Sequence, residues 1–72
     1  MIERLAHLTP REREIMELLI AGKTSKEIAA ALRVSVRTVE GHRRMVLSKA
    51  DVSSAAQLVR VVLSAREASR RA

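Results

Sequence analysis

The 72-residue sequence predicts an all-α fold with four helices. Residues that favour helix, such as Ala, Leu, Arg and Glu, are abundant, whereas only two Gly and one Pro are present. Four short polar segments carry the residue types that start helices, and apolar residues follow each segment at helical spacing. Because so short a chain supports only one core, we expect residues 1–72 to form a single domain.

The first helix is predicted over residues 10–21. Thr9 can cap it, Pro10 suits its first position, and Glu12 completes a capping box with Thr9. Gly22 follows where a left-handed C-terminal cap is expected. The apolar stripe between these two ends consists of Ile15, Met16, Leu18 and Leu19.

The second helix is predicted over residues 25–32, because Thr24 and Glu27 repeat the capping-box pattern. Its short apolar stripe is formed by Ile28, Ala29 and Leu32. A tight connection then leads to Ser35, which is expected to cap a third helix over residues 36–49. Val34 is placed to pack against Val39 as a hydrophobic staple.

The fourth helix is predicted over residues 55–65, with Ser54 and Gln57 forming a third capping box. Beyond about Arg66 the sequence is charged and loses its apolar periodicity, so we expect this tail to be frayed. The apolar residues of this helix spread over more than half its circumference, which exceeds the stripe that one core requires. Either the helix is partly exposed, or another surface covers it.

The outer side of the third helix is free to meet a partner. At 100° per residue, Val39, Val46 and Ala50 share the sector that must face the core, with His42 and Arg43 at its edges. The opposite sector contains Arg37, Glu40, Gly41, Arg44 and Ser48. A short capped helix, a tight turn and a longer helix with a basic outer face form the helix-turn-helix plan, in which the later helix enters the DNA major groove.

A simpler interpretation treats this sector as a solvated face on which Glu40 pairs with Arg44. Gly41 favours a binding role, because Gly inside a helix costs about 1 kcal/mol relative to Ala. A gap in the side-chain surface is useful where a base edge must come close, although a packing origin for Gly41 also remains open.

Charge and composition narrow the possible functions. The formal net charge of +6 favours polyanions, and the absence of Phe, Trp and Tyr argues against readers that stack single-stranded bases. With no Cys and only His7 and His42 as candidate general bases, we expect neither an enzyme, a metal site nor a cofactor. No apolar run approaches a membrane span and residues 1–4 lack the layout of a signal peptide, so we expect a cytoplasmic protein.

Several spaced motifs together resemble the LuxR-type, or GerE-type, DNA-binding domain of bacterial transcription regulators. The match covers about residues 8–63, and residues 37–43 look most similar to the FixJ/NarL branch of two-component response regulators. In that branch such a domain follows a phosphorylated receiver domain, so a receiver or sensor domain outside this chain is an expected partner. Met1 fits either a small free-standing regulator or an excised C-terminal domain. The matching residues are Leu8-Thr9-x-Arg11-Glu12-x-Glu14, Gly22, Lys26-Glu27-Ile28-Ala29, Leu32-x-Val34-Ser35, Thr38-Val39-x-x-His42, Val46 and Lys49.

The resemblance implies a four-helix domain that binds double-stranded DNA in transcription regulation, with the third helix in the major groove. By resemblance, the base-facing residues are Glu40, Gly41 and Arg44, and the phosphate-contacting ones are Lys26, Arg37, Thr38, His42 and Arg43. The helix N-termini add Ser25 to the phosphate set, because their free N–H groups favour anions. We expect Glu40 to orient Arg37 or Arg44, while His42 could equally pack or contact phosphate. Many relatives differ at Glu40, Gly41 and Ala50-Asp51, so their DNA preference does not transfer.

The resemblance also implies that the fourth helix forms a two-fold homodimer on DNA. The expected contact residues are Leu58, Val59, Val62 and Leu63, and two copies would then read half-sites about one helical turn apart. The alternative is a helical protein-interaction module that uses the same apolar face of residues 55–65 to dock another protein.

Overall fold

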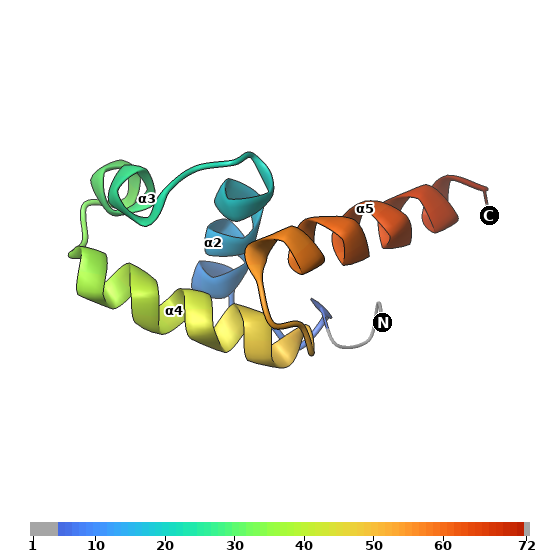
Figure 1. The fold of residues 1–72 in the computed structure, drawn as a ribbon, viewed down its shortest axis with the longest axis horizontal. Helices are drawn as coiled ribbons and strands as arrows, with labels where there is room; N and C mark the ends of the chain where they lie inside the picture. The colour runs from blue at the N-terminus through green and yellow to red at the C-terminus, as the bar shows by residue number, and fades with distance from the viewer. Residues whose placement is uncertain (1–4, 72) are drawn as a thin grey trace.

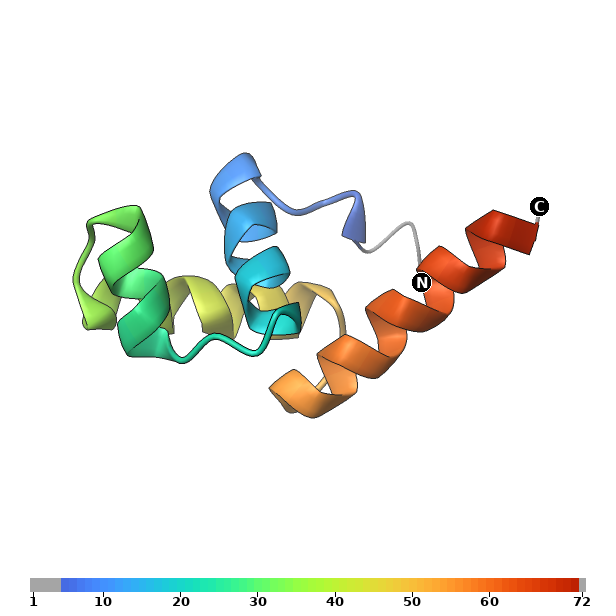
Figure 2. The same cartoon turned by 90° about the horizontal axis from the view of Figure 1, so that it is seen from above.

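A computed structural model describes residues 5–71 and consists of helices joined by short loops, with no strand among these residues. The helices are α2 (Pro10–Ile20), α3 (Ser25–Leu32), α4 (Val36–Lys49) and α5 (Ala55–Arg71). Helix α4 packs against both α2 and α3, whereas α5 contacts α2 and its C-terminal half projects beyond the other helices (Figures 1 and 2). The predicted all-α fold with four helices is confirmed for this part of the chain. The expectation about residues 1–4 lies outside the described residues.

Local capping sets the helix ends as the sequence predicted. Thr9 and Glu12 form a complete capping box, and Thr24 and Glu27 form the second. The Ser35 hydroxyl accepts a hydrogen bond from the backbone N–H of Thr38 and so caps α4. At the end of α2, Ala21 is the C-cap and Gly22 has a φ of 85°, a left-handed conformation that favours Gly.

The start of α5 differs from the predicted capping box in one bond. The Ser54 hydroxyl accepts from the backbone N–H of Gln57 at 3.2 Å, as expected. The Gln57 side chain, however, reaches back to the backbone N–H of Ser53 rather than to that of Ser54, at 2.7 Å. The two side chains therefore still satisfy two backbone donors at this helix start.

The C-terminal tail does not fray as predicted, because α5 continues to Arg71. The prediction was wrong because it required apolar periodicity, whereas this segment contains only helix-compatible Ala, Arg, Glu and Ser and lacks Gly and Pro. The guanidinium group of Arg66 also forms an ion pair with Glu17 on α2, which holds the helix beyond its buried part.

One cluster of buried side chains holds the helices together. Val39 and Val46 of α4 and its C-cap residue Ala50 are fully buried, as helical rotation predicted, and Val34 packs against the same cluster. The rest of the cluster comes from α2, α3, α5 and the segment before α2, here called the leader (residues 5–9). These residues are Leu8, Ile15, Met16, Leu19, Ile28, Ala29, Leu58 and Val62. The buried side of α4 is therefore fixed, and its remaining sides are left for solvent or a ligand.

A partly buried ion pair anchors the C-terminal end of α4. The ammonium group of Lys49 lies 2.6 Å from a carboxylate oxygen of Glu12 and donates to the backbone oxygen of His7 at 3.3 Å. The hydrogen bond from Lys49, followed by that from the backbone N–H of Thr9, holds the pKa of Glu12 below its usual value. Glu12 therefore joins the leader, the start of α2 and the end of α4.

Glu12 should make the stability of the fold sensitive to acid. Because its pKa is lower in the folded than in the unfolded chain, its contribution is complete above about pH 5 and is lost as the pH falls through the folded pKa. Glu12→Gln is expected to cost about 1 kcal/mol at neutral pH and to flatten the acid dependence measured by urea unfolding. Glu14→Gln is the matched control, because its pair with Arg11 is exposed. A Glu12→Gln curve parallel to that of the parent chain would contradict this role.

Candidate nucleic-acid interface

The outward sector of α4 is a continuous exposed surface. All of its predicted members lie in solvent: Arg37, Glu40, Gly41, Arg44 and Ser48. A Cβ atom placed on Gly41 would have no atom within 4 Å, so this Gly leaves an open gap on the surface and is not required by packing. The packing origin considered for Gly41 is therefore not supported, and two guanidinium groups share the sector with the gap.

The first turn of α4 presents hydrogen-bonding groups to solvent. The Ser35 hydroxyl accepts from the backbone N–H of Thr38 at 3.0 Å and donates to the Thr38 hydroxyl at 2.9 Å. Because the Thr38 oxygen accepts from Ser35, its own hydrogen is directed to a different acceptor. The first backbone N–H groups of any helix have no acceptor within that helix, so this end of α4 suits an anion.

The start of α3 has a similar chemistry. Ser25 is half-buried and Lys26 is exposed, directly after the cap formed by Thr24. The Glu27 carboxylate accepts from the backbone N–H of Thr24 at 2.9 Å, which holds the pKa of Glu27 below its usual value. Glu27 is thus a charged capping group, whereas Lys26 extends its ammonium group into solvent at an end where the helix dipole disfavours cations.

The edges of the outward sector are formed by His42 and Arg43, which are both half-buried. Glu40 lies 3.9 Å from Arg43, one turn along the helix. The expectation that Glu40 orients Arg37 or Arg44 is therefore corrected, since its neighbouring cation is Arg43. The Nε atom of Arg43 is buried and has no hydrogen-bond partner among the described residues, so the inner part of this side chain is held by packing. That position keeps its charged end beside Glu40.

The apolar residues of α5 are distributed between the core and the surface differently from what the sequence predicted. Leu58 and Val62 are 0% and 1% exposed, so both belong to the core of the single chain and cannot contact a partner. Val59 is half-buried, and Leu63 is 50% exposed. Of the four predicted dimer residues, only these last two remain available on the surface.

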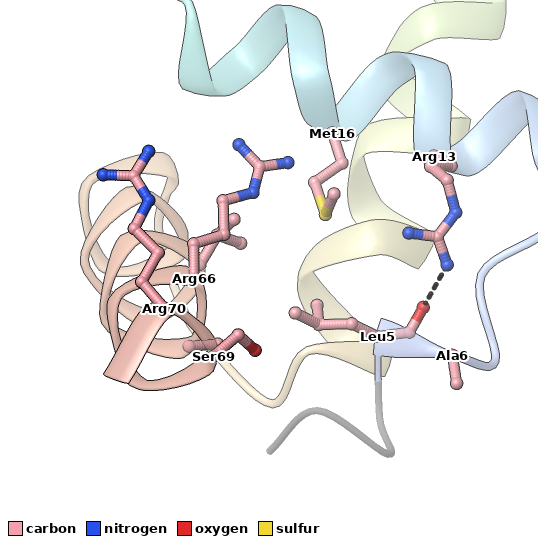
Figure 3. Close-up of a pocket in the computed structure, with 9 residues that line it drawn as sticks. Leu5, Ala6, Arg13, Met16, Arg66, Ser69 and Arg70 are labelled. Atoms are coloured by element: carbon pink, nitrogen blue, oxygen red, sulfur yellow. Dashed lines mark hydrogen bonds between the residues drawn. The ribbon is translucent and has the colours of Figure 1, made fainter. Parts of the chain in front are cut away.

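A groove of about 440 Å³ lies between the leader, α2 and α5. Leu5 and Met16 face Arg66, Ser69 and Arg70 of α5 across it, and Arg13 donates to the backbone oxygen of Leu5 at 3.0 Å (Figure 3). None of its lining residues belongs to α3 or α4: Leu5, Ala6, Arg13, Met16, Val62, Ala65, Arg66, Ser69 and Arg70. The groove is therefore separate from the exposed surface of α4.

Among residues 5–71, no helix has both the length and the apolar character needed to cross a bilayer.

Comparisons with known proteins all indicate one family of bacterial regulators. Residues 6–62 match the family described as bacterial regulatory proteins, luxR family. The chain is 45% identical over 62 residues to the transcriptional regulatory protein FixJ of Bradyrhizobium diazoefficiens, covering 86% of this chain and 30% of that protein. It is 46% identical over 52 residues to the spore germination protein GerE of Bacillus subtilis, covering 72% of this chain and 70% of GerE. The solved response regulator StyR superimposes with a TM-score of 0.83 at 35% identity, covering 86% of this chain and 31% of StyR.

Proposed function

Because the chain belongs to the luxR family of bacterial regulatory proteins, we propose that it binds double-stranded DNA in a sequence-specific way and regulates transcription. The resemblance to this family and to FixJ that the sequence predicted is confirmed. The observation that carries the proposal is the exposed sector of α4, where Arg37 and Arg44 flank the gap at Gly41. A helix of this kind fits the major groove of B-form DNA.

In this proposal the base-facing residues are Glu40, Gly41 and Arg44. Arg44 is free to form two hydrogen bonds to guanine O6 and N7, a contact worth about 1 to 3 kcal/mol of discrimination. Glu40 restrains the charged end of Arg43 and so acts indirectly, because a carboxylate beside the DNA backbone is repelled. The open gap at Gly41 allows the helix backbone to come close to the base edges.

The proposed phosphate contacts surround this sector. The cations Lys26, Arg37 and Arg43 supply charge, while the Thr38 hydroxyl and the first N–H groups of α3 and α4 supply hydrogen bonds. Ser25 and His42 complete the set, His42 through a ring at the edge of the buried sector. These contacts position the protein on the duplex, whereas the base-facing residues select the sequence.

Two substitutions test this division. Arg44→Ala is expected to weaken binding to the preferred duplex about 5- to 150-fold and to change binding to random duplex little, because it removes a base contact. Lys26→Ala should weaken both duplexes by a similar factor, because it removes a phosphate contact. Fluorescence anisotropy at one stated salt concentration measures both. Equal losses on the two duplexes from Arg44→Ala would exclude Arg44 as a base reader.

We further propose that two copies bind DNA together through the surface formed by Val59 and Leu63 of α5. Leu63 is the large exposed apolar residue of this helix, and a symmetric contact would cover it in both copies. A different protein that docks on the same surface is the competing interpretation.

The chain spans about a third of the length of FixJ and StyR, so we infer that a receiver or sensor domain acts together with it.

A further inference from the structure

We infer that Met45 and the gap at Gly41 together form a notch that receives the 5-methyl group of a thymine. This inference rests on the proposed DNA-binding function and adds a specificity-determining residue that sequence reasoning missed. The structure contains three exposed large apolar side chains among the described residues, namely Val36, Met45 and Leu63. Val36 begins α4 and Leu63 lies on α5, so Met45 is the large exposed apolar residue inside α4, at the edge of the outward sector next to Gly41.

Packing does not explain the position of Met45. Its exposed fraction is 46%, whereas the next residue, Val46, is fully buried in the core. Four steps of about 100° place Met45 about 40° around the helix axis from Gly41, on the same outward side. An apolar thioether side chain in solvent lacks the stabilisation that burial would give it. A ligand that covers Met45 would supply that burial and so explain why Met stands at this exposed position.

The direction of the Met45 side chain connects it to Gly41. Side chains on a helix lean toward the N-terminal end, so a residue covers the surface about one turn before its own Cα atom. For Met45 that surface is the turn containing Gly41, where nothing lies within 4 Å of an added Cβ atom. By this direction Met45 would form an apolar, flexible wall at the open position of Gly41, with Arg44 on the other side of that position.

The chemistry of the major groove identifies the occupant. Thymine is the only one of the four common bases that presents a methyl group there, and the other exposed groups are hydrogen-bond donors and acceptors. A notch whose wall is a thioether, which donates no hydrogen bond and accepts only weakly, matches that methyl group and leaves Arg44 to read a neighbouring base. The geometry therefore points to a preference for thymine beside the base that Arg44 contacts.

The test removes the methyl group from the DNA. A preferred duplex is first selected with the parent chain, and each thymine is then replaced singly by deoxyuridine, which lacks only the methyl group. One replacement should weaken binding of the parent chain about fourfold, the effect of burying a single methyl group. The same replacement should leave the affinity of Met45→Ala unchanged, whereas Met45→Leu, which keeps an apolar wall, should retain most of the sensitivity.

Gly41→Ala is the second variant, because it fills the notch without adding charge. It should lose the sensitivity to deoxyuridine while its melting temperature rises, since Ala is more favourable than Gly inside a helix and no atom obstructs it. The rise in melting temperature separates a blocked notch from a damaged fold.

The remaining outcomes overturn the inference in distinguishable ways. If the parent chain binds its selected duplex with equal affinity after every replacement, it makes no contact with a thymine methyl group. The proposed DNA-binding function would be unaffected by that result. Equal losses in the parent chain and in Met45→Ala assign the methyl contact to another residue. A parent chain that binds no duplex at low salt removes both this inference and the proposed function.

Discussion

Raising the salt concentration from about 50 to about 200 mM is expected to lower the affinity of this chain for duplex DNA about a thousandfold. In the proposed complex each copy places three cations, Lys26, Arg37 and Arg43, against phosphates, so two copies would neutralise about six charges. The logarithm of the binding constant then falls with the logarithm of salt concentration with a slope of about −5. A single bound copy would lose only about 40-fold, so the slope also reports how many copies bind.

Fluorescence anisotropy across this salt range measures the slope. Lys26→Gln should make it less steep by about 1 for each copy bound, whereas Arg60→Gln, an exposed cation on α5, should leave it unchanged. A slope near zero would contradict a phosphate-binding surface. A slope that changes only with Arg60→Gln would move the DNA contact from α4 to α5.

Val62→Asp is expected to unfold the chain, although Val62 was predicted from sequence to be a surface contact. Its side chain is 1% exposed, and a carboxylate there would be buried without a partner, which costs several kcal/mol, on the order of the whole stability of so small a fold. Circular dichroism should show loss of helix. Leu63→Asp, the neighbouring residue with half its surface exposed, should keep the helical signal and melt normally.

The same pair of variants tests the α5 surface. On a duplex with two half-sites, Leu63→Asp should bind as single copies in sedimentation velocity, because its charge would be buried in the symmetric contact. A folded Val62→Asp chain would show that the core assignment of α5 is wrong. An unchanged two-copy complex with Leu63→Asp would exclude this surface as the contact between copies.

The bounds of α2, α3 and α4 were predictable because they depend on local chemistry. Thr9, Thr24 and Ser35 each bond to a backbone N–H three residues later, and such bonds require only neighbours in sequence. The exposed sector of α4 was equally predictable, because helical rotation fixes which residues oppose Val39 and Val46.

The features that the sequence did not predict depend on long-range packing. The apolar part of α5 is too wide for one contact, and only its docking against α2 decides that Leu58 and Val62 turn inward. The pair between Glu12 and Lys49 joins residues 37 positions apart, which no local pattern indicates. The tail was misjudged partly for a local reason, since its residues favour helix without apolar periodicity, and partly because its contact with α2, from Arg66 to Glu17, is long-range.

Amide chemical shifts measured during titration with a selected duplex at low ionic strength test most directly whether the exposed sector of α4 enters DNA. The largest shifts are expected at Arg37, Gly41 and Arg44, with smaller shifts at the start of α3 and little change in residues 66–70. Fixed shifts throughout α4, with movement confined to α5 when a protein partner is added, would contradict the entry of α4 into DNA and favour a protein-interaction module.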